Sequence, residues 1–238
     1  MSDVTHYTAA ETKRIEFLRK LNILDTENEE IFDNLTALVA SLLNVPIVMI
    51  SLVDENRQWF KSVVGLNICE TTREVSFCQH VVNDGRILMI EDTKSDPRFR
   101  DNPLVTGEPF IRSYMGIPVR PDGHFVVGTL CVVDTMPREF SGDELSLLAS
   151  FVLQVEGLLR SHQRRMALQF RYKRLETDKQ HVEEIAEAYR LVALALAEGH
   201  IQLDTDGVIQ TVSAEVAARL PSAIKGFSLA QALDRFKE

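Results

Sequence analysis

The sequence predicts an α+β protein in which helical segments flank a central run of short strands. Apolar residues recur every three or four positions in residues 11–43 and again in residues 141–197, as in amphipathic helices. Between residues 47 and 134 the period falls to two, as in strands that bury one face. With 238 residues, 45% of them apolar, the chain can bury one ample core and part of a second.

Charge and composition argue against several classes of partner. The formal net charge of −9 opposes binding to phosphate-rich surfaces, because nucleic-acid affinity comes mainly from Lys and Arg. We therefore expect no nucleic acid and no membrane among the partners. No run approaches the ~20 apolar residues of a membrane span, and the first residues lack the apolar segment of a secretory signal. The sequence thus predicts a cytoplasmic protein.

The cysteines and histidines do not form a metal or disulfide pattern. Cys69, Cys78 and Cys131 are odd in number and stand at unrelated spacings, which fits reduced thiols better than a disulfide framework. The six histidines lie far apart, and Cys78-Gln79-His80 cannot supply four ligands. We expect no metal site, and the cofactor is unknown.

Two helices, Glu11–Lys20 and Glu29–Leu43, are predicted before the first strand. In the second helix, one set of apolar residues at helical spacing predicts a stripe that faces a core: Ile31, Leu35, Leu38, Val39 and Leu42. Thr26, followed three residues later by Glu29, predicts a capping box. Pro46 ends this helix, and the strand pattern begins directly after it.

The central segment contains five predicted strands. The first two, Ile47–Asp54 and Arg57–Val63, form a hairpin across a short polar turn. The other three are Ile87–Glu91, Ile111–Pro118 and Phe125–Asp134. Between the strands lie a short helix, Ser76–Val82, and a long loop, Asp92–Pro109, punctuated by Pro and Gly. A loop of this length inside a compact domain usually covers a functional site.

A single long helix is predicted from about Ser141 to Ala197, and Ser141 and Glu144 form a capping box at its start. Two apolar runs step along it by three and four: Leu145, Leu148, Val152, Val155 and Leu159, then Val182, Ile185, Tyr189, Val192 and Leu196. The runs are out of phase, which places a register break within Arg160–Arg174. This pattern predicts a two-stranded coiled coil with a stutter.

The tail after Gly199 reads as the front of a further domain. Strands are predicted at His200–Asp204 and Val208–Val212, joined by the hairpin dipeptide Asp206-Gly207, before helix resumes at Glu215–Leu220. About 40 residues with two strands cannot bury a sheet face. We expect this segment to lack a stable core of its own.

From Thr12 to about Leu159 the chain resembles the GAF domain family, in the form found in front of bacterial histidine kinases and diguanylate cyclases. The motifs are ILDT (Ile23–Thr26), FDNLTALVA (Phe32–Ala40), VPIVMISLVDENRQWFKS (Val45–Ser62), ETTREVSFCQH (Glu70–His80), DPRFRDNPLVTG (Asp96–Gly107), IRSYMGIPV (Ile111–Val119) and GTLCVVDTMPREF (Gly128–Phe140). The resemblance implies an antiparallel sheet of five or six strands. It also implies that the N-terminal helices and the start of the long helix cover one face, with a small-molecule pocket on the other.

The tail His200–Leu220 is similar to the opening of a PAS domain. The chain then divides into four parts: an N-terminal helix and turn (1–26), the GAF domain (27–159), a signalling coiled-coil helix (160–198) and an incomplete PAS-like segment (199–238).

Alternation along the strands assigns residues to the two faces of the expected sheet. The aliphatic set suits packing on helices: Val48, Ile50, Leu52, Leu130 and Val132. The mixed set suits a cavity wall: Met49, Ser51, Thr129 and Cys131. The alternative is that these smaller residues lie under a tightly packed loop without a ligand.

Further candidates for ligand binding lie on the short helix and the strand after the loop: Phe77, Cys78, His80, Arg112 and Tyr114. A few polar groups among aromatic rings are what fixes a ligand's orientation. The planar fork of Arg112 suits an anionic ligand. The alternative for Arg112 is an ion pair with Asp92 or Asp96 that pins the loop.

A sensory or regulatory role without catalysis follows from the resemblance. A small-molecule ligand or a change of redox state would alter how the sheet packs on the helices, and with it the register or rotation of paired helices. The expected partners are a second copy, in a parallel homodimer through Leu145–Leu159 and Val182–Leu196, and an output module of histidine kinase or diguanylate cyclase type.

Two alternatives stay open. The first is a ligand-free dimerisation module. The second is a free methionine sulfoxide reductase, an activity of some GAF proteins that needs an accessible, low-pKa thiolate beside a resolving cysteine. Cys69 and Cys78 are near in sequence, whereas Cys131 lies inside a strand, and the spacing does not match that reductase. Gln79 also separates Cys78 from His80, which disfavours a covalent bilin.

Overall fold

The computed structural model describes residues 8–197, 201–203 and 209–213, and the chain divides into two compact units, Met1–Met166 and Ala167–Glu238. The first unit contains, in order, α1 (Ala9–Lys20), α2 (Glu30–Leu43), β1 (Ile47–Val53), β2 (Arg57–Val64), β3 (Glu70–Thr72), α3 (Cys78–Asp84), β4 (Leu88–Ile90), α4 (Pro103–Thr106), β5 (Ser113–Val119) and β6 (Gly128–Asp134). Helix α5 (Gly142–Ala197) runs from the first unit into the second, which also contains β7 (Ile201–Leu203) and β8 (Ile209–Val212).

The strands of the first unit form one antiparallel sheet in the order β3-β2-β1-β6-β5-β4. The predicted α+β fold with an antiparallel sheet is therefore confirmed. The sixth strand, β3, and the single-turn helix α4 lie in segments where the sequence predicts only loop. Strands β7 and β8 pair as the predicted hairpin. Its turn dipeptide Asp206-Gly207 and the predicted helix Glu215–Leu220 lie outside the described residues.

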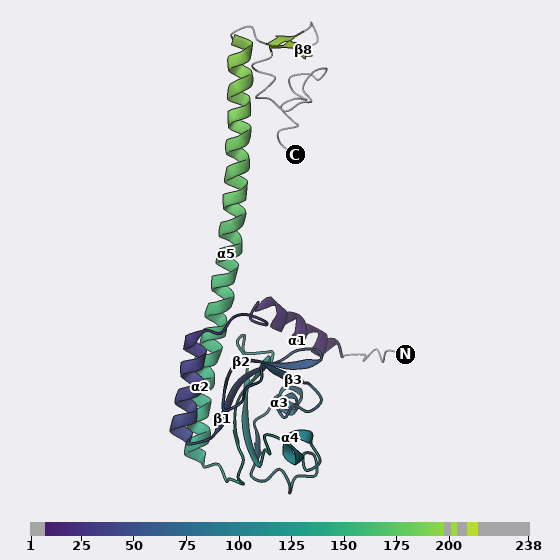
Figure 1. Ribbon diagram of the computed structural model, residues 1–238, viewed down its shortest axis with the longest axis vertical. Coiled ribbons are helices and arrows are strands. Elements are labelled where there is room, and N and C mark those ends of the chain that lie inside the picture. Colours follow the sequence, from purple (N-terminus) through teal and green to yellow (C-terminus); the bar gives the residue numbers. More distant parts are fainter. Residues whose placement is uncertain (1–7, 198–200, 204–208, 214–238) are drawn as a thin grey trace, which may run out of the picture. The chain divides into compact units, whose positions relative to one another are not determined.

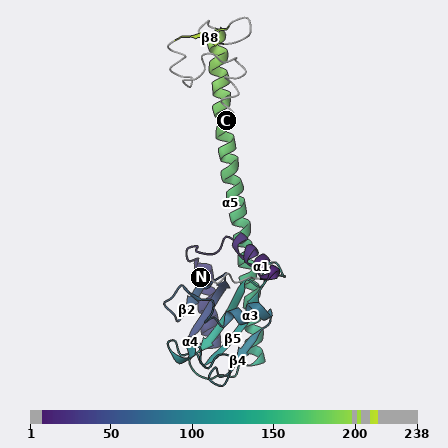
Figure 2. The same ribbon diagram turned by 90° about the vertical axis from the view of Figure 1, so that its right-hand side faces the viewer.

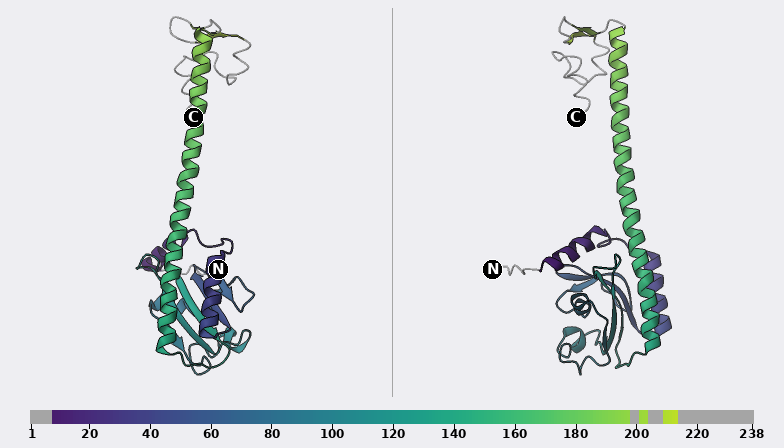
Figure 3. Two further views of the ribbon diagram at one scale, coloured as in Figure 1. Left: turned by 90° about the vertical axis from the view of Figure 1, so that its left-hand side faces the viewer. Right: turned by 180° about the vertical axis from the view of Figure 1, so that it is seen from behind.

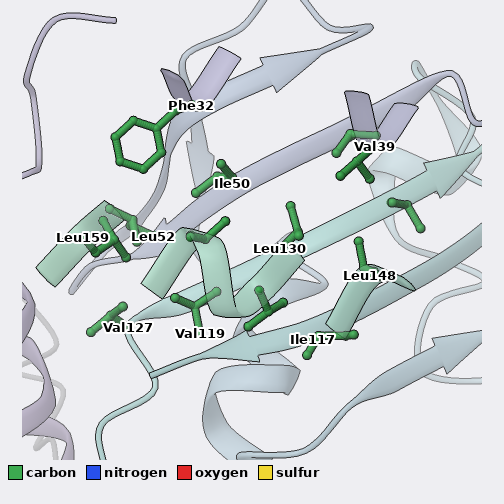
Figure 4. Packing of buried hydrophobic residues seen from close by; sticks show 14 of the residues in the cluster. Phe32, Val39, Ile50, Leu52, Ile117, Val119, Val127, Leu130, Leu148 and Leu159 are labelled. Atoms are coloured by element: carbon green, nitrogen blue, oxygen red, sulfur yellow. The ribbon is translucent and has the colours of Figure 1, made fainter. Parts of the chain in front are cut away.

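Helices α2 and the first part of α5 lie side by side on one face of the sheet (Figures 1 and 3). Phe32 and Val39 of α2 meet Leu148 and Leu159 of α5 over the central strands, as Figure 4 shows. The aliphatic set predicted for this face is buried here: Val48, Ile50, Leu52, Leu130 and Val132. Strand alternation thus assigned the helix-covered face correctly.

The buried face of α2 is rotated relative to the predicted stripe. Phe32, Thr36, Val39 and Leu43 are buried, whereas Ile31, Leu38 and Leu42 are 54%, 50% and 53% exposed. The reason is a polar residue in the sheet-facing row, because the Thr36 hydroxyl hydrogen-bonds to Ser62 Oγ on β2 at 2.7 Å. The predicted stripe is therefore correct at Val39, which is buried, and at Leu35, which packs against the core, and wrong at Ile31, Leu38 and Leu42.

Of the two predicted capping boxes, one forms. Glu144 N donates to Ser141 Oγ at 3.2 Å and Ser141 N donates to Glu144 Oε2 at 2.8 Å, so the start of α5 is confirmed. The box at Thr26 is wrong, because its hydroxyl donates to Ile23 O instead. Glu29 is the N-cap residue but makes no side-chain cap. Its carboxylate is engaged by cations from elsewhere in the domain.

The first apolar run of α5 packs within the chain itself. Leu148, Val152, Val155 and Leu159 belong to the core under the sheet. They are therefore not the wet seam that motivated a dimer through Leu145–Leu159, and that part of the reasoning is wrong. Further along, a stripe at seven-residue spacing is exposed: Leu168, Leu175 and Val182, at 63%, 66% and 64%. Within the described residues, no helix is apolar over a membrane-spanning length.

Candidate functional site

The other face of the sheet is covered by α3, α4 and the connections around them (Figure 2). Alternate residues of β1 and β6 point to this side, where they form a second buried cluster with Phe77, Phe99 and Tyr114. The ring of Phe77 stacks on Phe99 with centroids 4.3 Å apart and is tilted against Tyr114 at 5.3 Å. This aromatic layer holds α3 and the long loop on the sheet.

A small cavity of about 30 Å³ lies within this cluster. Its lining comes from five strands, from α3 and α4, and from the loops around them: Met49, Gln58, Phe60, Leu66, Ile68, Thr71, Ser76, Phe77, Cys78, Leu104, Pro109, Ile111, Tyr114 and Val133. Such a volume holds about one water-sized molecule. Ser76 Oγ donates to Gln58 Oε1, whereas the buried Thr71 hydroxyl has no hydrogen-bond partner among the described residues.

The structure brings four of the nine predicted site residues to the cavity wall: Met49, Phe77, Cys78 and Tyr114. Ser51, Thr129 and Cys131 lie on the predicted face but behind Cys78, and Ser51 Oγ hydrogen-bonds to Thr129 Oγ1 at 3.2 Å. The loop supplies part of the roof through Leu104 and Pro109, as expected.

Two predicted site residues do not line the cavity. Arg112 donates from Nη2 to both carboxylate oxygens of Asp92 at 3.0 Å, which is the loop-pinning alternative and not an anion site. His80 lies half-buried with its ring edge on Phe99, 4.9 Å between centroids. Burial and the nearby positive charge of Arg98 both lower the pKa of His80. Helix geometry explains this position, because residues two apart on a helix lie on different faces, so the side chains of His80 and Cys78 leave α3 in different directions.

Sequence reasoning missed the contribution of β2 and β3 to the cavity. Phe60 and Gln58 face it, while Trp59 between them belongs to the helix-side core. The period-two pattern of β2 contained this signal, because Phe60 pairs with Ser51 across the sheet. Thr71 could not be found in this way, since β3 is three residues long and has no readable period.

Two thiols meet behind the cavity. Cys78 Sγ lies 3.6 Å from Cys131 Sγ, and the Tyr114 hydroxyl donates to Cys78 Sγ at 3.3 Å. Both thiols are buried and free. Burial alone raises the pKa of Cys78, but hydrogen bonds from Cys131, Ser51, Thr129 and Tyr114 to its thiolate outweigh that effect and lower the pKa to about 6.

The proton of this pair stays on the second sulfur. The hydrogen bond to Cys78, burial and the thiolate charge of Cys78 all raise the pKa of Cys131. Burial, followed by the negative charge of the Cys78 thiolate, raises the pKa of Tyr114 as well, so its hydroxyl remains a donor. The arrangement therefore favours a single thiolate, on Cys78, which is the cysteine of the pair that lines the cavity.

On the opposite face, a buried cation joins the sheet to α5. A β-bulge in β2 leaves Lys61 without a partner in the β1 register and directs its side chain to the helices. This side chain is 0% exposed, and its Nζ lies 3.0 Å from Glu29 Oε1. Glu29 Oε2 also binds Arg165 Nη2 of α5 at 2.6 Å, and His162 Nδ1 is 3.3 Å from Oε1. We call Lys61, Glu29, His162 and Arg165 the ionic clasp.

The domain thus has an antiparallel sheet with helices on one face and a small, mostly apolar cavity on the other, which is the architecture of an α+β ligand-binding domain. The GAF domain family matches residues 27–159, more than half of the chain, and the chain belongs to this family.

The chain is also 39% identical, over 132 residues, to a cyclic di-GMP phosphodiesterase of Pseudomonas aeruginosa; the match covers 56% of this chain and 22% of that protein. The chain thus spans about a fifth of the length of this relative. Among solved structures, the GAF domain of an Acinetobacter phosphoenolpyruvate-protein phosphotransferase is 22% identical with a TM-score of 0.49, over 67% of this chain and 97% of that one. A free methionine-R-sulfoxide reductase of Neisseria meningitidis is 15% identical with a TM-score of 0.46, over 67% and 95%.

Proposed function

We propose that this GAF domain is a non-catalytic sensory module, which converts a change in its cavity into a change in α5 that an output module reads. One observation carries the proposal: strand β2 lines the cavity with Gln58 and Phe60 and, at its bulge, holds Lys61 in the ionic clasp with α5. A shift of β2 caused by a ligand would therefore act directly on the clasp.

The lining indicates the chemistry of the ligand. Most of the wall is aliphatic or aromatic, and the Thr71 hydroxyl is a buried polar group without a hydrogen-bond partner in the part of the chain that the structure describes. A small apolar molecule with one hydrogen-bonding group fits this pattern. Ligand pockets usually enclose ~300–1,000 Å³, so any larger molecule must displace the roof, and this displacement would be the signal.

The output module belongs, in this proposal, to the histidine kinase or diguanylate cyclase type, or acts otherwise in cyclic di-GMP turnover. The similarity to a protein named as a cyclic di-GMP phosphodiesterase supports the last of these. The chain would act in the cytoplasm as a parallel homodimer joined through the second part of α5. The exposed stripe of Leu168, Leu175 and Val182 supports this partner.

Native mass spectrometry of the purified chain, followed by hydrogen exchange with and without the captured molecule, tests the proposal. We expect a bound small molecule that lowers exchange around Thr71 and changes it around Arg165. Thr71→Val should weaken that binding about tenfold, as the loss of one hydrogen bond implies. Binding without any change in exchange at residues 160–166 would contradict the relay.

A further inference from the structure

The pair of thiols behind the cavity is built differently from ordinary buried cysteines. Cys78 and Cys131 come from different elements, α3 and β6, and their sulfurs are 3.6 Å apart. A disulfide needs about 2.05 Å between the sulfurs, so each sulfur would move only about 0.8 Å. The third cysteine, Cys69, is exposed and takes no part in this contact.

One of the two cysteines lies beside the cavity. Cys78 lines the cavity, whereas Cys131 does not. The volume of about 30 Å³ admits a molecule of the size of water or hydrogen peroxide and excludes a bulky disulfide such as an oxidised thiol peptide. The hydroxyl of Tyr114, at 3.3 Å, stabilises negative charge on Cys78 Sγ. The cavity, the hydroxyl donor and the second sulfur thus all lie next to the same residue, Cys78.

We propose that Cys78 and Cys131 form a peroxide-sensing pair, in which a small peroxide entering the cavity oxidises Cys78 and Cys131 then closes an intramolecular disulfide. In the first step the Cys78 thiolate attacks one peroxide oxygen, an S–O bond forms, the O–O bond breaks, and hydroxide leaves. In the second step Cys131 gives its proton to that hydroxide and attacks Cys78 Sγ; the S–S bond forms and the second oxygen leaves as hydroxide, which becomes water with the proton that Cys78 released on ionising. Two thiols and one hydrogen peroxide yield one disulfide and two waters.

The disulfide would tie α3 to the middle of β6. The neighbours of Cys131 on β6, Leu130 and Val132, pack on the opposite face in the core that contains α5. A shift of β6 toward α3 would therefore disturb that core. This last consequence rests on the proposed sensory function, whereas the disulfide chemistry does not.

The test uses the full chain, reduced and then exposed to graded hydrogen peroxide. Counting thiols by alkylation under denaturing conditions should give three before treatment and one after it, and peptide mass spectrometry should find Cys78 joined to Cys131 in a monomer. Cys131→Ser should stop at a sulfenic acid on Cys78, trapped by dimedone. Cys69→Ser is the matched control and should oxidise as the parent does.

Tyr114→Phe keeps the ring and removes one donor to the Cys78 sulfur, so it should raise the pKa of Cys78, slow sulfenic acid formation at pH 7 and move the pH profile of that reaction to higher pH. Bonds that involve Cys69, bonds between chains, or an unmodified Cys78 in folded Cys131→Ser would overturn the proposal. Hydrogen exchange separates it from the sensory function: a disulfide that forms without altering exchange at residues 160–166 upholds the peroxide site and contradicts the relay.

Discussion

The two faces of strands β1 and β6 have the same backbone and opposite chemistry. On the helix side, Ile50 and Leu52 of β1 and Leu130 of β6 are buried among aliphatic side chains of α2 and α5. On the cavity side, Ser51 and Thr129 share a hydrogen bond, and Cys131 meets a second thiol. The difference shows how a period of two lets one strand present an aliphatic face to the helices and a face with hydroxyl and thiol groups to the cavity side. A change on one face must pass through the same backbone to reach the other.

The largest effect is expected on the helix side. Leu52→Ala removes a fully buried side chain and should lower the free energy of unfolding by ~2–5 kcal/mol, because packed neighbours cannot fill the space. Urea denaturation measures this. Ile31→Ala, at a residue 54% exposed on α2, is the control and should cost less than ~0.5 kcal/mol. If the two variants lowered the free energy of unfolding equally, the helix-side core would not be the main source of the domain's stability.

The next effect concerns the ionic clasp. Glu29→Gln removes the carboxylate beside the buried Lys61 ammonium, whose remaining acceptors among the described residues are neutral: Thr26 Oγ1 at 3.0 Å and Glu27 O at 2.8 Å. We expect a loss of ~1–3 kcal/mol, the cost of an incompletely paired buried group. The control is Glu30→Gln, an exposed residue with the same change in charge. If the ionic clasp holds α5 in place, hydrogen exchange at residues 162–165 should be faster in Glu29→Gln than in the parent and unchanged in Glu30→Gln.

The clasp has a pH dependence of definite sign. Burial raises the pKa of Glu29, but hydrogen bonds from Lys61 and Arg165 outweigh it, so the pKa lies below the ordinary 4.5. A carboxyl group whose pKa is lower in the folded state than in the unfolded state stabilises the fold. This contribution is complete at pH values above the unfolded-state pKa, and it is lost as the pH falls through the folded-state pKa. The difference in stability between the parent and Glu29→Gln should therefore be constant above about pH 5 and vanish in stronger acid. A difference that persists in acid would contradict the charge-based account.

Association through α5 should respond next. Leu175 is 66% exposed in the centre of the seven-residue stripe, and Leu175→Glu would place a charge in the seam of a parallel pair. Sedimentation should show the parent as a dimer at micromolar concentration and the variant at least about tenfold weaker. Thr177→Glu, two residues away on another side of the helix, is the control. A parent chain that sediments as a monomer would refute the dimer outright.

Sequence reasoning succeeded where one physical rule dominates. Alternation placed every aliphatic residue of β1 and β6 named for the helix face correctly, because a strand has only two sides. It was only partly right for α2, where Thr36 occupies a buried position. For Arg112 it left a ligand and an ion pair with Asp92 both open, because the choice depends on where the loop lies, and the structure shows the ion pair. The 3.6 Å distance between the Cys78 and Cys131 sulfurs could not be predicted from the sequence either. These residues are 53 positions apart and meet only through the docking of α3.

The smallest effect on stability, and the most specific one on chemistry, belongs to Thr129→Val. This change keeps the branched shape and removes a hydroxyl that hydrogen-bonds to Ser51 and to the Cys78 thiolate. The loss of this hydrogen bond should lower the free energy of unfolding by about 1 kcal/mol or less. The thiolate loses a donor, so the pKa of Cys78 should rise, and the pH profile of its oxidation by peroxide should move to higher pH.

Thr106→Val offers a matched control, since Thr106 is exposed on α4 and its hydroxyl bonds only to Asn102 O among the contacts that the structure describes. Its profile should stay in place. If Thr129→Val instead destabilised the domain as much as Leu52→Ala, with no shift in the profile, the hydroxyl would be a packing element. The two faces would then differ in composition but not in role. If the pH profile of Cys78 oxidation shifts while the free energy of unfolding stays unchanged, the cavity side serves thiol chemistry and the helix side serves stability.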